Sequence, residues 1–201
     1  MKSFAAIAFL AASANAFTGT PLAISSVSKS TELKMSVWDT YQGGVDFRGK
    51  EFKFDPLKLS ETYTPLVPFF RESELRHGRT AMLAVVGFVI PEIFRLPGDA
   101  YSFEAVGKVT DAHNALIVGP MHQLLLWISL WDIVIGIPAI TALNKGEREA
   151  GDFGFTWLMP KDEAGKKKRV DQELLNGRLA MMAIGGIATQ TVLTGHGFPY
   201  L

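Results

Sequence analysis

A nine-residue motif occurs twice in this 201-residue chain, and the two copies begin 99 positions apart. Residues Glu74–Met82 read ELRHGRTAM and residues Glu173–Met181 read ELLNGRLAM, so six of the nine positions are identical. A fainter loop repeat precedes them, FKFDPL at 52–57 and FGFTWL at 153–158, so the repeated unit is a loop and a helix. Each motif opens an apolar segment. A carboxylate and a guanidinium at membrane depth are expensive, and such groups are usually functional.

The two charges within one copy of the motif cannot serve each other. At about 100° per residue, Arg79 lies about 140° around a helix from Glu74. If the two copies cross as symmetry mates, Glu74 meets Arg178. By the same symmetry Glu173 meets Arg79, and each pair offsets a desolvation cost that one charge alone could not sustain. The glycine of each motif allows the close approach that this crossing needs.

Three apolar stretches are long enough to cross a bilayer, which takes roughly 20 helical residues. They run from about 73 to 94, from 115 to 143 and from 172 to 193. The middle stretch belongs to neither repeat, and Asp132 is its one acidic or basic residue apart from a histidine. The pattern predicts an all-α membrane protein with three transmembrane helices, the first and third crossing as a pseudo-twofold pair. A soluble helical bundle is the alternative.

The composition excludes several classes of function. Lys and Arg together number 20, as do Asp and Glu, so the chain has no excess of basic charge for nucleic acid. Cysteine is absent, which excludes disulfides, thiolate metal sites and a cysteine nucleophile.

The first 35 residues have the composition of a targeting sequence. Residues 1–16 contain a basic start, a short apolar run and a small-residue cleavage site, as a signal peptide does. Residues 17–35 are rich in Ser and Thr and carry a single acid, which is typical of a plastid transit segment. The alternative is a plain secretory signal followed by a linker. We expect the mature domain to span 36–201.

The motif also offers metal ligands. Glu74 and His77 lie one helical turn apart, and Glu173 and Asn176 repeat this arrangement. Oxygen and nitrogen donors at apolar depth suit hard or borderline cations, and one donor per metal suits a metal already held in a macrocycle. The alternatives are that the Glu–Arg pairs are purely structural locks, that the histidine is a hydrogen-bonded core residue, and that the asparagine bonds a backbone carbonyl.

The repeated Glu-x-x-His/Asn-x-Arg-x-Ala-Met motif, on the first and third of three helices, resembles that of the light-harvesting chlorophyll-binding proteins of plastids. The resemblance covers roughly residues 43–201 and includes the Phe-Asp-Pro-Leu loop at 54–57 and the tail that begins at Gln190. It implies three thylakoid-spanning helices, crossed Glu–Arg pairs, and no catalysis.

The resemblance also implies residue roles, position by position. On the middle helix Asp132 stands where the chlorophyll a/c branch has a glutamate. The aspartate side chain is one methylene shorter, and a bridging water can fill the resulting gap to the magnesium. His122, beside Gln123, is an alternative ligand there. Arg79 and Arg178 are the implied ion-pair partners. The implied chlorophyll magnesium ligands are Glu74, His77, Gln123, Asp132, Glu173, Asn176 and Gln190.

The short chain and the two-part presequence resemble the red-lineage, fucoxanthin-type chlorophyll a/c antennas. This implies chlorophyll a, chlorophyll c and carotenoids of the xanthophyll type as cofactors, and a multi-pass place in the plastid thylakoid membrane. The implied partners are a photosystem core, other antenna subunits and thylakoid lipid. The expected function is an antenna that passes excitation energy to a photosystem. A photoprotective, quenching member of the same family is the alternative, and a small membrane transporter is a more remote one.

Overall fold

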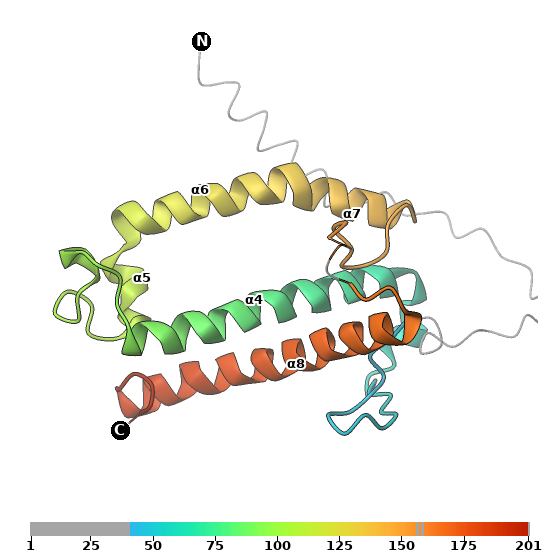
Figure 1. Ribbon diagram of the computed structural model, residues 1–201, viewed down its shortest axis with the longest axis horizontal. Coiled ribbons are helices and arrows are strands. Elements are labelled where there is room, and N and C mark those ends of the chain that lie inside the picture. The colour runs from blue at the N-terminus through green and yellow to red at the C-terminus, as the bar shows by residue number, and fades with distance from the viewer. Residues whose placement is uncertain (1–40, 156, 158, 201) are drawn as a thin grey trace, which may run out of the picture. The chain divides into compact units, whose positions relative to one another are not determined.

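The computed structural model describes residues 41–155, 157 and 159–200, and the predicted signal peptide and transit segment lie outside these residues. Three long helical stretches make up most of the described part (Figure 1). No strand occurs among the described residues, apart from one isolated antiparallel bridge between Val45 and Glu51. The described part is therefore helical, as the sequence predicts.

The first and third helices begin earlier than their apolar stretches. Helix α4 runs over Val67–Ile93, after the short helices α3 (Leu59–Thr62) and η1 (Thr64–Leu66), and has a proline in its first turn. Helix α8 runs over Glu163–Thr194, and its cap Asp162 accepts a hydrogen bond from a backbone N–H of the first turn. Helix α4 starts with the apolar turn Val67–Phe70, and the charged residues Arg71 and Glu72 then separate this turn from the apolar stretch. The first turns of α8 are charged, so hydropathy does not detect them.

The middle stretch consists of joined segments. Helix α5 (Ala112–Ala115) and the segment η4 (Ile117–Met121), which kinks at a glycine–proline pair, lead into α6 (His122–Trp131). A π-helical turn, η5 (Asp132–Gly136), then joins α6 to α7 (Ile137–Asn144) without a break in helical backbone geometry. Such single π turns often mark functional sites in helices.

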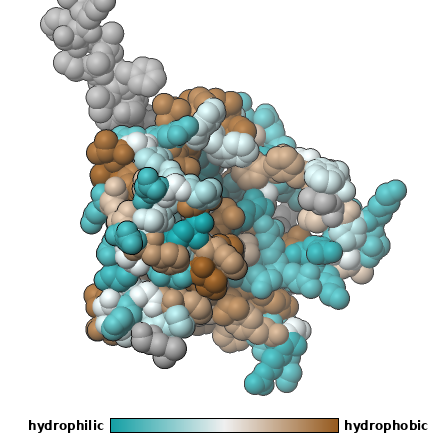
Figure 2. All heavy atoms as spheres, turned by 60° about the vertical axis from the view of Figure 1, so that its left-hand side comes forward, coloured by the Kyte–Doolittle hydropathy of each residue, from teal (hydrophilic) through white to brown (hydrophobic). Residues whose placement is uncertain are grey.

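Among the described residues, one helix is long and apolar enough to cross a membrane, the stretch Ile117–Asn144. Only 11% of its most apolar window is buried inside the protein, so its side chains are not those of a core helix. Large apolar side chains such as Leu125, Trp127 and Ile133 are more than half exposed along it. Figure 2 shows apolar patches open at one face of the molecule, between polar ones.

The two motifs meet where α4 packs against α8. These helices lie side by side and run in the same direction, and α6 and α7 run the opposite way (Figure 1). Three of the positions that are identical between the two motifs are buried in both copies. They are Leu75 and Leu174, Gly78 and Gly177, and Ala81 and Ala180. These three pairs of identical residues are therefore buried where the two copies pack together.

Candidate functional site

The contact between α4 and α8 is closest at the two motif glycines. A Cβ atom built on Gly78 would lie 3.1 Å from the Cα of Gly177, and one built on Gly177 would lie 3.0 Å from the Cα of Gly78. These distances are shorter than ordinary carbon contacts, and the obstacle on each side is backbone. Only glycine therefore allows this approach of the two helices.

The charges of the two motifs pair across this contact. The Nε of Arg79 donates to Oε1 of Glu173 at 2.6 Å, and the Nε of Arg178 donates to Oε1 of Glu74 at 2.8 Å. Each of the four side chains is about one third exposed, so the pairs lie at the rim of the crossing. These are the pairs that the helical angles predict.

Each arginine also holds a loop. The Nη1 of Arg178 donates to the carbonyl of Gly43 at 2.7 Å, and the Nη2 of Arg79 donates to the carbonyl of Gly151 at 3.0 Å. Both glycines have positive φ, 102° and 80°, which a side chain would strain. The crossing therefore has two ends of the same construction, each with a glutamate, an arginine from the other helix and a glycine carbonyl.

The loop repeat is less regular in the structure than in the sequence. Aligning the two Phe-x-Phe segments would pair Gly151 with Lys50, yet Gly43 has the corresponding contact. The reason is a closed turn, in which the N–H of Phe52 donates to the carbonyl of Gly44 at 2.7 Å. Residues 45–51 fold back on themselves between these two hydrogen-bonded residues. Gly43 therefore lies close to Phe52 in space, although nine positions separate them in the sequence.

His77 and Asn176 are exposed, and each is oriented by a hydrogen bond to the backbone carbonyl four residues earlier. The Nδ1 of His77 lies 2.7 Å from the carbonyl of Ser73, which can only accept, so in the neutral ring Nδ1 carries the proton and Nε2 has the lone pair. The Nδ2 of Asn176 donates to the carbonyl of Gln172 at 2.9 Å, which leaves Oδ1 as the free acceptor. A hydrogen bond to the backbone typically orients metal-binding side chains in this way.

The two glutamates keep different numbers of free acceptor sites. Oε2 of Glu173 has no hydrogen-bond partner among the described residues, whereas Oε2 of Glu74 accepts from Nη1 of Arg71 at 3.1 Å. An ionised carboxylate has about four lone-pair sites, so each glutamate retains an acceptor position. Within the part that the structure describes, no group of three or more His, Cys, Asp or Glu residues could hold a metal ion. Single donors suit a metal that a ring already holds.

The remaining predicted ligands lie away from the crossing. Gln123 is exposed on α6 and lines a largely apolar cleft of about 1000 Å³ between α4 and α6, with Phe88 and Trp127. Oδ1 of Asp132 accepts from Nη2 of Arg76 at 2.7 Å, so this carboxylate also ties the middle helix to α4. His122 and Gln190 are likewise exposed, on α6 and α8.

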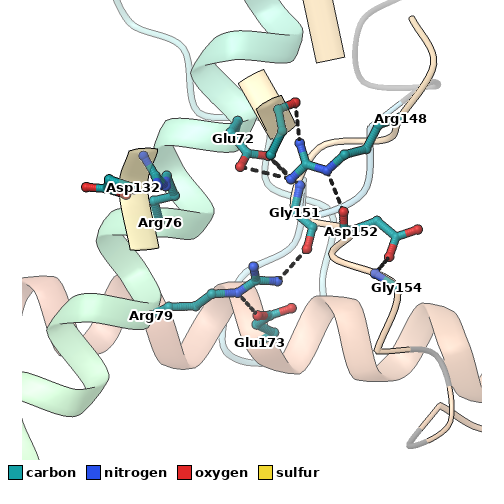
Figure 3. Close-up of polar contacts among 10 residues, drawn as sticks. Glu72, Arg76, Arg79, Asp132, Arg148, Gly151, Asp152, Gly154 and Glu173 are labelled. Carbon is teal, nitrogen blue, oxygen red and sulfur yellow. Dashed lines mark hydrogen bonds and ion pairs between the residues drawn. The ribbon is translucent and has the colours of Figure 1, made fainter. Parts of the chain in front are cut away.

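Sequence reasoning missed a third charged pair. Glu72 is 2% exposed and accepts from Nη2 of Arg148, which lies 3.0 Å from both carboxylate oxygens (Figure 3). The N–H of Gly151 donates to Oε2 of the same carboxylate at 2.6 Å. An acidic residue at the matching place of the second copy, Asp171, shows that the repeat extends two residues upstream. Nothing in the sequence, however, indicates which loop cation reaches Glu72.

A groove of about 710 Å³ lies against α4, α8 and the segment that precedes α4, and its lining is mostly apolar. Phe54, Phe70 and Met182 line it, as does Glu74. Asp55 lies at its edge, where the hydroxyl and the backbone N–H of Ser60 hold the pKa of the Asp55 carboxyl below its usual value. The groove therefore combines an apolar wall with one carboxylate of the crossing.

The chain resembles known proteins over most of its length. Residues 38–192 match the family described as Chlorophyll A-B binding protein. The fucoxanthin-chlorophyll a-c binding protein of Chattonella marina var. antiqua is 30% identical over 204 residues, which cover 97% of this chain and 89% of that protein. A protein of the same name from Isochrysis galbana is 30% identical over 76% of each chain. The light-harvesting complex stress-related protein 1 of Chlamydomonas reinhardtii is 34% identical over 70% of this chain and 60% of its own.

The matched region contains α4, the middle helical stretch and α8 up to residue 192, and with them both motifs and both ion pairs. The family match covers more than half of the chain. The chain therefore belongs to the chlorophyll A-B binding protein family, whose members are light-harvesting pigment-binding proteins and not enzymes.

Proposed function

We propose that this protein is an antenna of the plastid thylakoid membrane, which holds chlorophylls and carotenoids at fixed positions and passes excitation energy to a photosystem. Bound chlorophyll supplies the absorption and the transfer of excitation. The residues of this chain supply position and orientation, and no bond is made or broken. The chloroplastic relatives support this location, and their names support chlorophyll a, chlorophyll c and fucoxanthin-type xanthophylls as pigments.

One observation carries the proposal: the two ends of the crossing each present a carboxylate and, one turn later, an outward acceptor. Glu74 and His77 do so on α4, and Glu173 and Asn176 do so on α8. The hydrogen bond of each of these two side chains to a backbone carbonyl orients the side chain and leaves its acceptor atom free for a ligand. We assign these four residues as magnesium ligands, with Gln123 and Gln190 as further single ligands. Oδ2 of Asp132 is an additional candidate, because Arg76 engages only Oδ1.

In this proposal α4, the middle stretch and α8 all span the membrane, with α4 and α8 crossing as a pseudo-twofold pair. The lengths of 27 and 32 residues for α4 and α8 support it, because a span takes roughly 20. The crossed ion pairs support it too, since each charge has a partner at the crossing. The apolar groove of about 710 Å³ beside the crossing is the place we assign to a carotenoid.

An absorption spectrum of the protein purified in mild detergent, with extraction of its pigments, tests the proposal. We expect chlorophyll a, chlorophyll c and a xanthophyll to copurify. Replacing His77 by Leu should remove a single chlorophyll without loss of the complex, because its side chain makes no contact across the crossing. The exposed neighbour Thr80, changed to Val, is the control. A colourless protein would instead favour a transporter that uses the Glu–Arg pairs as a gate.

A quenching role is the second candidate, and the similarity to the stress-related protein of Chlamydomonas reinhardtii favours it. The same pigments would then dissipate excitation rather than pass it on. The chlorophyll fluorescence lifetime of the purified complex separates the two roles. An antenna keeps the same lifetime at neutral and acidic pH, whereas a quencher that responds to acid shows a shorter lifetime at acidic pH.

A further inference from the structure

The buried carboxylate of Glu72 takes no part in the crossing itself, yet it is the least exposed charged group among the described residues. Three donor contacts satisfy it, two from Nη2 of Arg148 and one from the N–H of Gly151. Arg148 in turn donates to the carbonyls of Ala139 and Asp152. This cluster fastens the loop after α7 to α4.

A chain of contacts leads from this cluster to Glu173 (Figure 3). Glu72 fixes the peptide of Gly151 through its N–H, and the carbonyl of the same glycine accepts from Nη2 of Arg79 at 3.0 Å. The Nε of Arg79 then donates to Oε1 of Glu173 at 2.6 Å. The ring of Phe153 lies under both guanidiniums, 4.7 Å from the Cζ of Arg148 and 5.8 Å from that of Arg79.

In the part of the chain that the structure describes, the other end of the crossing has no such cluster. Asp171 stands two residues before Glu173, as Glu72 stands before Glu74, but its buried Oδ1 has no hydrogen-bond partner among the described residues. At that end Arg71 contacts Glu74 directly instead. The two glutamates are therefore held by different means.

A buried ion pair is a weak source of stability, because desolvation cancels much of the attraction between its charges. What Glu72 and Arg148 do fix is geometry, since the hydrogen bonds of the Gly151 peptide place Arg79. A carboxylate that binds a metal needs its orientation held by the residues behind it. The position of Oε1 of Glu173 determines where its free Oε2 points.

We propose that Glu72 and Arg148 are positioning residues for Glu173, which they orient through Gly151 and Arg79, and that they do not act on Glu74. This inference rests on the proposed role of Glu173 as a pigment ligand. It predicts that loss of the buried pair changes the pigment at one end of the crossing and spares the pigment at the other.

The test uses pigment complexes of the full-length variants, isolated in mild detergent, and first identifies the two pigments. The double variant Glu173→Leu with Arg79→Leu removes one ligand together with its counter-ion, and its difference absorption spectrum defines the Glu173 band. The double variant Glu74→Leu with Arg178→Leu defines the Glu74 band in the same way. If the first double variant keeps its full pigment content, the ligand role of Glu173 is wrong, and this inference is wrong with it.

The decisive variant is Glu72→Gln, which keeps the size of the side chain and removes its charge. We expect it to shift or lose the Glu173 band and to leave the Glu74 band unchanged. Arg148→Lys should have the same effect on the two bands, because lysine keeps the charge but cannot contact Glu72 and the carbonyl of Ala139 at once. If Glu72→Gln yields no complex, Arg148→Lys serves as the test. Asp171→Asn is the matched control and should leave the Glu173 band in place.

Two results would overturn the inference. Either Glu72→Gln and Arg148→Lys both leave the Glu173 band as it is, or they change the two bands equally. The second result would show a general effect on stability, in which the pair does not orient Glu173.

Discussion

The two ends of the helix crossing share a plan but differ in how their glutamates are supported. At one end Glu74 has two arginine partners, Arg178 from the other helix and Arg71 from its own. At the other end Glu173 has Arg79 alone, and a loop that a buried carboxylate fastens supports that arginine. The repeated motif thus fixes which charges pair, and the residues outside the motif make the two ends unequal.

The largest effect should come from the feature that both ends share, the glycine contact. Changing Gly78 to Val places side-chain atoms against the backbone at Gly177, where even a Cβ atom is too close. We expect loss of the assembled pigment complex, at a cost above the roughly 1–3 kcal/mol of ordinary overpacking. Pigment yield after purification measures it. Gly87→Val, at an open position of the same helix, is the control and should assemble normally.

The next effect should separate the two ends. Arg79→Leu leaves Glu173 without a charged partner, and we expect loss of assembly and of the pigment at Glu173, at a cost of about 3 kcal/mol. Arg178→Leu should be milder, because Arg71 still contacts Glu74. The yield of assembled pigment complex from each variant, purified side by side, gives the order. Equal yields would show that Arg71 gives no support.

A smaller effect should appear at one end only. Arg71→Leu removes the second partner of Glu74, and we expect a loss of about 1 kcal/mol or less, with a changed absorption band for the pigment at Glu74. The pigment at Glu173 should be unaffected, since the carboxylate that Arg71 contacts is that of Glu74. Difference absorption spectra detect the change, and Arg71→Lys should restore part of the signal.

The smallest effect concerns the loop before α4, which contributes Asp55 to the groove beside Glu74. Hydrogen bonds from Ser60 lower the pKa of Asp55, so the ionised form stabilises the folded loop. This stabilisation is present above the ordinary pKa of about 3.9 and is lost as pH falls through the lower, folded value. Below about pH 4 we expect lower protection of the amides of 57–60 against hydrogen exchange, relative to their intrinsic exchange rates at the same pH. Asp55→Asn should remove this pH dependence, and an unchanged profile would contradict it.

The crossing was predictable because it depends only on the helical angle and on the repetition of the motif. An Arg five residues after a Glu cannot reach it on one helix, so the second copy had to supply the partner. The support at each end was not predictable in this way. Arg148 lies in a loop whose path depends on tertiary packing, and the folded-back turn before Phe52 shifts the pairing of the two loops by several residues.

The helix ends likewise include features that could not be predicted from the sequence. The predicted third stretch begins at 172, but α8 begins at Glu163, since its charged first turns need no apolar surroundings and Asp162 caps them. Asp132 was expected only as a ligand because of its place on the middle helix. Its contact with Arg76 joins two helices that share no repeat, and no periodicity in the sequence reports such a pair.

The separation of the paired residues along the chain also limits when the crossed pairs can form. Arg178 lies 104 residues beyond Glu74, and Glu173 lies 94 residues beyond Arg79. Until α8 is in place, Arg79 has no carboxylate partner and Glu74 has only Arg71 of its own helix. A chain that is cut between the motifs lacks the partners that α8 supplies to Arg79 and Glu74. The two crossed pairs therefore form only in a chain that contains both copies of the motif, and their presence distinguishes a finished molecule from an incomplete one.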